Sequence, residues 1–135
     1  MAHILVVEDD PSNQIVMRKA LTKIGGYAVT VSEDVATILS LARARQVDLV
    51  VMDVSLANSV YQGQHLDGVA ITQLLKSDEA ARPVPVLLAT AYAMQGDAER
   101  LRAACGADGY ISKPFVEPRE LVEKVRSLLA ARPAA

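Results

Sequence analysis

The sequence lacks the residues on which several protein classes depend. Cys105 is the only cysteine, which excludes a disulfide scaffold and favours a reducing compartment. His3 and His65 are the only histidines, and neither has a second histidine or a cysteine nearby, which argues against a zinc site. The 14 Lys and Arg residues are scattered and offset by 16 Asp and Glu, which argues against nucleic-acid binding.

Long hydrophobic runs are also missing. The first apolar run, residues 4–7, has no basic lead and passes directly into acidic residues, so it is not a signal peptide. The longest apolar stretch, residues 84–94, contains Pro85 and Thr90 and is too short to span a bilayer. We therefore expect no membrane segment and a cytoplasmic location.

What remains is the composition of a globular chain. The 135 residues are 51% hydrophobic and 22% charged, with a formal net charge of −2. This length suits one domain, and a domain of this size buries enough apolar surface to fold without disulfides or a structural metal. We expect residues 1–135 to form a single domain.

Apolar patterning alternates between buried strands and amphipathic helices along the whole chain. The predicted strands are 3–7, 27–31, 47–52, 84–89 and 110–112. The predicted helices are 11–24, one capped by Ser32, one capped by Asp67, about 94–105 and about 117–131. Strict alternation predicts an α/β fold: a five-stranded parallel, doubly wound sheet with five helices, in the flavodoxin-like order 2-1-3-4-5.

Ligands of such sheets bind at the carboxyl ends of the strands. Glu8 and Asp9 follow the first strand, Asp53 ends the third, Thr90 follows the fourth and Lys113 follows the fifth. Two carboxylates about 4 Å apart repel by roughly 4 kcal/mol at an effective dielectric of about 20. Mg²⁺ would offset this repulsion, and the set of groups suits phosphoryl transfer to Asp53.

Five motifs after the five strands carry a resemblance that covers nearly the whole chain. They are residues 4–10 (ILVVEDD), 48–53 (DLVVMD), 85–91 (PVLLATA), 106–110 (GADGY) and 113–115 (KPF). In this order they resemble the receiver domains of two-component response regulators. Residues 90–97 are similar to stand-alone receivers of the cell-cycle type.

The resemblance implies a role for each site residue. Asp53 would accept a phosphoryl group from a histidine kinase or phosphotransfer protein, with Thr90 and Lys113 binding that group. Mg²⁺ would be held by Glu8 through water, by Asp9 and Asp53 directly, and by the backbone carbonyl of Ser55. Tyr110 would move inward with Thr90 and switch a protein-binding surface, or the group would be relayed onward. We expect a monomer or weak dimer.

The chain departs from the family pattern after Asp53. Receivers usually reach the next helix sooner, whereas here an insertion at about residues 56–66 predicts a polar, mobile loop. This loop is either a tolerated surface insertion or a partner-recognition or gating element, with neither favoured. By resemblance, Ser55 and Tyr92 would tune the access of hydrolytic water. Only residues 114–135 follow Lys113, so we expect no output domain.

Two other functions fit the same fold. An aspartyl-nucleophile phosphohydrolase usually carries a second aspartate two residues after the nucleophile, where this chain has Ser55, and the length leaves no room for a cap domain. An interaction module that is never phosphorylated would not need the acidic set, Thr90 and Lys113. We therefore expect a phosphoacceptor whose only catalysis is its own phosphorylation and dephosphorylation.

Overall fold

A parallel sheet forms the centre of the protein. The computed structural model describes residues 2–56, 59–91, 97–113 and 117–131. The sheet consists of β1 (His3–Val7), β2 (Ala28–Val31), β3 (Leu49–Asp53), β6 (Val86–Thr90) and β7 (Gly109–Ser112). Their spatial order is β2-β1-β3-β6-β7, with every neighbouring pair parallel. Counted along the chain this is the order 2-1-3-4-5, which confirms the predicted sheet.

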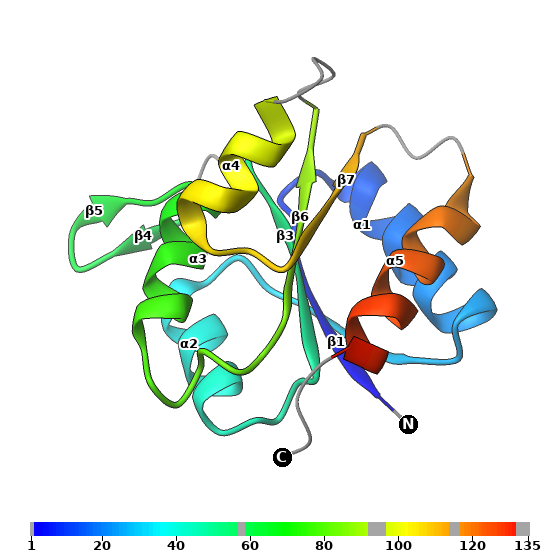
Figure 1. Cartoon of the computed structure of the whole chain (residues 1–135), viewed down its shortest axis with the longest axis horizontal. Coiled ribbons are helices and arrows are strands. Elements are labelled where there is room, and N and C mark those ends of the chain that lie inside the picture. The colour runs from blue at the N-terminus through cyan, green and yellow to red at the C-terminus, as the bar shows by residue number, and fades with distance from the viewer. Residues whose placement is uncertain (1, 57–58, 92–96, 114–116, 132–135) are drawn as a thin grey trace.

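Helices cover both faces of the sheet. They are α1 (Pro11–Lys19), the π-helix η1 (Ala20–Ile24), α2 (Val35–Arg43), α3 (Gly68–Ser77), α4 (Asp97–Cys105) and α5 (Pro118–Ala131). In Figure 1, α1 and α5 lie on one face, and α2, α3 and α4 on the other. The doubly wound prediction is therefore confirmed. No helix in the described ranges is long and apolar enough to cross a membrane.

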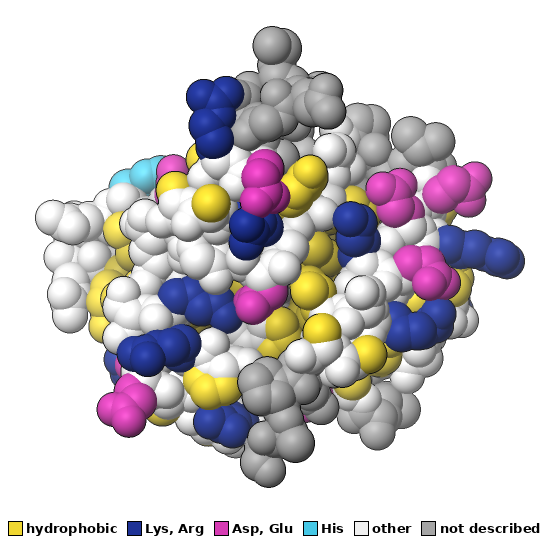
Figure 2. Space-filling view, viewed as in Figure 1, with side chains coloured by type: hydrophobic (Ala, Val, Ile, Leu, Met, Phe, Trp, Pro, Cys, Tyr) yellow, Lys and Arg dark blue, Asp and Glu magenta, His cyan; other side chains and the backbone are white. Residues whose placement is uncertain are grey.

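Each face of the sheet has its own hydrophobic core. Along β1, Leu5 and Val7 pack with α2 and α3, whereas Ile4 and Val6 pack with α1 and α5. This alternation follows from the two-residue period of a strand, and it explains why both β3 and β6 are buried along their whole length. Charged side chains of both signs are interspersed on the surface (Figure 2), as the nearly balanced composition predicts.

Aspartates begin three of the helices. The side chain of Asp10 accepts a hydrogen bond from the backbone N of Asn13, with Pro11 at the first helical position, and Asp67 caps α3 in the same way. The prediction that Ser32 caps the second helix is wrong. Asp34 is the cap, because its Oδ2 accepts from the backbone N of Thr37 at 3.0 Å and the helix starts at Val35.

The insertion, predicted as a polar, mobile loop, contains a β-hairpin. β4 (Val60–Tyr61) pairs antiparallel with β5 (Gln64–His65). Gln62 and Gly63 join them with φ of 52° and 80°, the positive values that a two-residue type I′ turn requires. The hairpin projects from the side of the molecule that carries α2 and α3 (Figure 1).

Candidate functional site

The carboxyl ends of the strands bring together the predicted site residues. Glu8 and Asp9 directly follow β1, Asp53 is the last residue of β3, Thr90 is the last residue of β6, and Lys113 directly follows β7. Because all five strands are parallel, these ends share one edge of the sheet, at the top in Figure 1. Residues more than 100 positions apart in the chain are thereby placed in contact.

Three carboxylates form the acidic part of the site. One oxygen each from Glu8, Asp9 and Asp53 lies within 4.8 Å of the other two. Glu8 is 1% exposed and Asp53 is 2% exposed, so two of the three are removed from bulk water. Their mutual repulsion is therefore poorly screened, and the site favours a bound cation.

Lys113 bridges two of these carboxylates. Its Nζ donates to Glu8 Oε1 and to Asp53 Oδ1, each at 2.9 Å. Burial by itself would lower the pKa of Lys113, but the hydrogen bonds to Asp53 and Glu8 outweigh it and raise that pKa above its ordinary value. The lysine is thus held protonated, with its charge fixed beside Asp53.

Glu8 is held by the backbone and by α1. Burial raises the pKa of its carboxyl above the ordinary value, while the hydrogen bond from Lys113 opposes that rise. Its Oε2 accepts from the backbone N of Asp10 at 3.2 Å. The side chain of Gln14 donates to the Glu8 carbonyl at 2.7 Å, a contact that sequence patterns do not reveal because a glutamine on a helix surface carries no signal of its own.

The donor set of the site fits a magnesium ion. Glu8, Asp9 and Asp53 offer only oxygen atoms, which Mg²⁺ prefers, and one ammonium group leaves two negative charges of the ionised trio uncompensated. A divalent cation would balance these charges. The backbone N of Ser55 donates to Asp53 Oδ1 at 3.2 Å, which fixes the start of the following loop against the same carboxylate.

Gly68 lies in close contact with the backbone of Asp53 and Val54. A Cβ atom there would lie 1.9 Å from the backbone oxygen of Asp53 and 2.9 Å from Val54 Cα, so only glycine fits without a backbone shift. The Gly68 N also donates to the Val54 carbonyl at 3.0 Å, which closes the insertion onto the end of β3. The sequence offered one clue to this contact, a poor helix former at the first helical position after Asp67.

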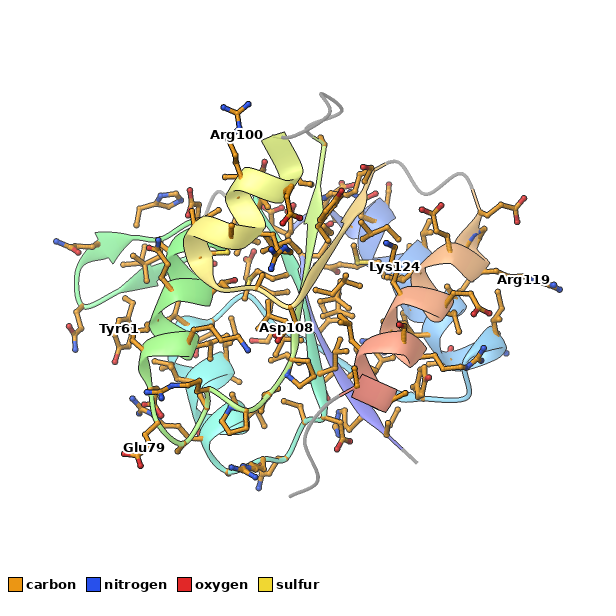
Figure 3. All side chains as sticks on the ribbon, viewed as in Figure 1. Tyr61, Glu79, Arg100, Asp108, Arg119 and Lys124 are labelled. Atoms are coloured by element: carbon orange, nitrogen blue, oxygen red, sulfur yellow. The ribbon has the colours of Figure 1, made fainter. Side chains whose placement is uncertain are left out.

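Thr90 and Tyr110, two further predicted site residues, differ in how deeply they are buried. Thr90 is 1% exposed, and its carbonyl accepts from the Lys113 N at 2.8 Å, so the two residues are joined through the backbone. Tyr110, on β7, is partly buried against one of the two hydrophobic cores, and the Nζ of Lys124, labelled in Figure 3, lies 5.8 Å from its ring centroid. Tyr92 lies outside the described residues.

Comparisons with known proteins agree with this geometry. The sequence profile of the response regulator receiver domain matches residues 4–126. The polar-differentiation response regulator DivK of Brucella ovis is 36% identical over 126 residues, which cover 93% of this chain and 94% of DivK.

Solved structures show the same fold. The receiver domain of the sensor histidine kinase PA1611 from Pseudomonas aeruginosa PAO1 has a TM-score of 0.77 and 33% identity, covering 96% of this chain and 98% of that domain. That structure holds a magnesium ion coordinated in its active-site cleft. A putative response regulator from Chloroflexus aurantiacus has a TM-score of 0.76 and 26% identity, covering 96% of this chain and 99% of the other.

Proposed function

The chain belongs to the response regulator receiver domain family, and on that premise we propose that Asp53 is its phosphoacceptor in two-component signalling. One observation carries the proposal: the buried Asp53 carboxylate accepts a hydrogen bond from the ammonium group of Lys113 and lies within 4.8 Å of two further carboxylates. A nucleophile, a fixed cation and a set of metal ligands are the parts that phosphoryl transfer requires.

Each residue has a defined part in the transfer. An Asp53 oxygen attacks the phosphorus of a phosphohistidine, the P–N bond breaks, and the histidine nitrogen keeps the electron pair and takes up a proton. Lys113 stabilises the negative charge of the transferred group, and the Thr90 hydroxyl donates to one of its oxygens. Mg²⁺ held by Glu8, Asp9, Asp53 and the Ser55 carbonyl would neutralise the remaining phosphoryl charge. Because all these groups belong to one chain, the chain catalyses its own phosphorylation.

The phosphoryl group then changes a surface of the protein. We assign the change to Thr90 moving toward the phosphoryl group and Tyr110 moving into the space that it leaves, beside α4, β7 and α5. Tyr110 is suited to this role because it is partly buried and rests against a surface lysine, Lys124. A local charge change is thereby converted into a change of packing that a partner protein detects.

The phosphoryl donor is a protein, a histidine kinase or a histidine phosphotransfer protein. Helix α1 starts directly after the acidic residues and exposes apolar side chains, with Ile15 57% and Val16 40% exposed. Apolar side chains exposed together beside a reactive site favour contact with another protein. The proposal includes a cytoplasmic location, where the chain would encounter such donors. It also includes a single-domain chain that acts by binding other proteins.

Phosphorylation of the purified protein tests the proposal. With Mg²⁺ and acetyl phosphate, the intact mass should increase by one phosphoryl group, and Asp53→Asn should abolish the increase. Asp10→Asn is a matched control, since it changes a neighbouring exposed aspartate and an asparagine still caps α1. No mass increase in the wild type, or an increase that persists in Asp53→Asn, would overturn the proposal.

A further inference from the structure

A cavity lies away from the phosphorylation site, between α2 and the β4–β5 hairpin. Its volume is about 450 Å³, within the range of cavities that bind ligands or partner side chains. It is lined by five residues of α2 and its carboxyl end and one of β4, namely Ala36, Leu39, Ser40, Arg43, Ala44 and Tyr61. None of them belongs to the carboxylate–lysine cluster. We call this cavity the α2–hairpin groove.

Small side chains on α2 create the groove. Ala36, Ser40 and Ala44 are exposed and follow one another at intervals of four residues, so they lie on one face of the helix. Leu39 is buried beside them and gives the groove an apolar floor. The opposite wall is Tyr61, labelled in Figure 3 on the side of the molecule that carries α2 and α3.

The hairpin wall is fixed in place. The buried Ser59 donates from its Oγ to the Glu33 carbonyl at 2.7 Å, which ties the start of the hairpin to a residue just before α2. The Nε2 of His65 lies 3.0 Å from the Leu56 carbonyl and ties the other strand to the buried base of the insertion. A groove with preformed walls loses little conformational entropy when a ligand binds.

The chemistry of the groove selects its occupant. Arg43 uses its Nε to donate to Asp78 Oδ2 at 2.6 Å, while its two terminal nitrogens make no hydrogen bond to any other described residue. A guanidinium edge of this kind binds a carboxylate through two parallel hydrogen bonds. The groove therefore combines an apolar floor with an arginine at its rim, whose charge is partly balanced by Asp78 but whose terminal nitrogens face no other described partner.

We propose that the α2–hairpin groove is a docking site for a partner protein, which inserts an aliphatic side chain against Leu39 and Tyr61 and places an adjacent carboxylate on Arg43. Helix α2, which lines the groove, and helix α1 lie on opposite faces of the sheet (Figure 1). A phosphoryl donor on α1 would therefore leave the groove on α2 free for a second partner. The insertion after Asp53 supplies one wall of this second site.

Synthetic peptides test the proposal directly. The ¹⁵N-labelled full chain is titrated with a capped hexapeptide that has Leu-Glu-Leu-Glu at its centre, and with matched peptides that have Leu-Lys-Leu-Lys or Ser-Glu-Ser-Glu. Only the first should shift the amide resonances of residues 36–44 and 60–64. Equal shifts from all three peptides, shifts confined to other surfaces, or no shifts at all would each overturn the proposal.

Variants separate the groove from the rest of α2. Ser40→Leu fills the cavity from an exposed position, and Arg43→Gln removes the guanidinium group that would bind the carboxylate. Each should weaken peptide binding by at least about tenfold, as expected for loss of a charged hydrogen bond or of an apolar contact. Arg45→Gln is the matched control, because Arg45 is exposed but does not line the cavity, and it should change binding by less than about twofold. An Arg45 effect as large as that of Arg43 would contradict the assigned site.

Discussion

Lys113 and Lys76 lie at opposite ends of the same sheet, and each places its ammonium group among several oxygen atoms. Lys113, at the carboxyl ends of the strands, donates to the carboxylates of Glu8 and Asp53. Lys76, at the amino ends, donates to the Arg82 and Val84 carbonyls and to Asp108.

The two clusters differ in charge balance. Lys76 meets a single carboxylate, and that carboxylate also accepts from the backbone N of Val86 at 2.8 Å, so the positive and negative charges cancel. Lys113 belongs to a group with three carboxylates, two of them almost fully buried. The balanced cluster joins α3 to the starts of β6 and β7, and its charges require no further counterion. The unbalanced one favours binding of further positive charge, which suits it to a metal and to phosphoryl chemistry.

Replacing each lysine by methionine should give the largest difference between the two ends. Lys113→Met removes the cation that we propose stabilises the phosphoryl group, so phosphorylation by acetyl phosphate should slow by about 100-fold. Lys76→Met should leave the rate within about twofold, because its cluster lies at the other end of the sheet. Intact-mass time courses measure both rates. A similar slowing in the two variants would show that the ends of the sheet are not functionally distinct.

Stability should show the reverse order. Lys76→Met leaves Asp108 and two carbonyls without their donor and should lower the free energy of unfolding by about 2 kcal/mol, with or without Mg²⁺. Lys113→Met should also be destabilising in EDTA, but Mg²⁺ should recover most of that loss by balancing the carboxylates. Urea unfolding in both buffers measures the effect. Recovery of Lys76→Met by Mg²⁺ would contradict the comparison.

The sequence predicted the unbalanced end better than the balanced one. Residues that end parallel strands must share an edge, so the order of the strands is enough to place Glu8, Asp53 and Lys113 together. The same reasoning does not find the Lys76–Asp108 pair, because Lys76 lies in the last turn of α3 and Asp108 directly before β7, at positions that no periodicity singles out. The order of the strands therefore predicts which side chains meet at the ends of parallel strands. The Lys76–Asp108 ion pair depends instead on how the end of α3 lies against the segment before β7.

The remaining differences between the predicted and the observed structure have local causes. Ser32 and Asp34 are both good capping residues, and the choice between them depends on where the chain turns into α2, next to the Glu33 carbonyl that the hairpin residue Ser59 binds. The hairpin itself is short, and its polar residues show no apolar alternation to reveal strands. The contacts of Gln14 and Gly68 depend on the positions of distant backbone atoms, to which sequence patterns are insensitive.

Gly68 and Gly106 allow the two ends of the sheet to be compared through substitutions that act on the backbone. Gly68→Ala places a Cβ against the Asp53 carbonyl and should force a shift of the phosphoacceptor, with a loss of about 2 to 3 kcal/mol and slower phosphorylation. Gly106→Ala, near Lys76, meets only side-chain atoms at 3.5 Å or more but has a φ of 79°. It should cost about 1 kcal/mol and leave phosphorylation unchanged. Urea unfolding and mass time courses distinguish them; unimpaired phosphorylation in Gly68→Ala would show that this contact does not position Asp53.

The excess negative charge at the carboxyl ends should also produce a small pH dependence. Burial raises the pKa of Glu8 above the ordinary value of 4.5, so between that value and the raised pKa the folded chain keeps a proton that the unfolded chain has released. In EDTA, the free energy of unfolding should therefore fall as the pH rises through this interval.

The lowered pKa values of Asp34, Asp78 and Glu99 act in the opposite sense. They act only below the ordinary values of 3.8 for the two aspartates and 4.5 for Glu99, which leaves the interval above 4.5 to Glu8. Glu8→Gln should flatten this part of the pH profile in EDTA, because glutamine does not titrate. Mg²⁺ should flatten it in the wild type, because a bound cation favours the ionised carboxylate. Urea unfolding at closely spaced pH values measures the slope. An identical slope in the wild type and in Glu8→Gln would mean that this carboxylate does not carry the uncompensated charge at the carboxyl ends.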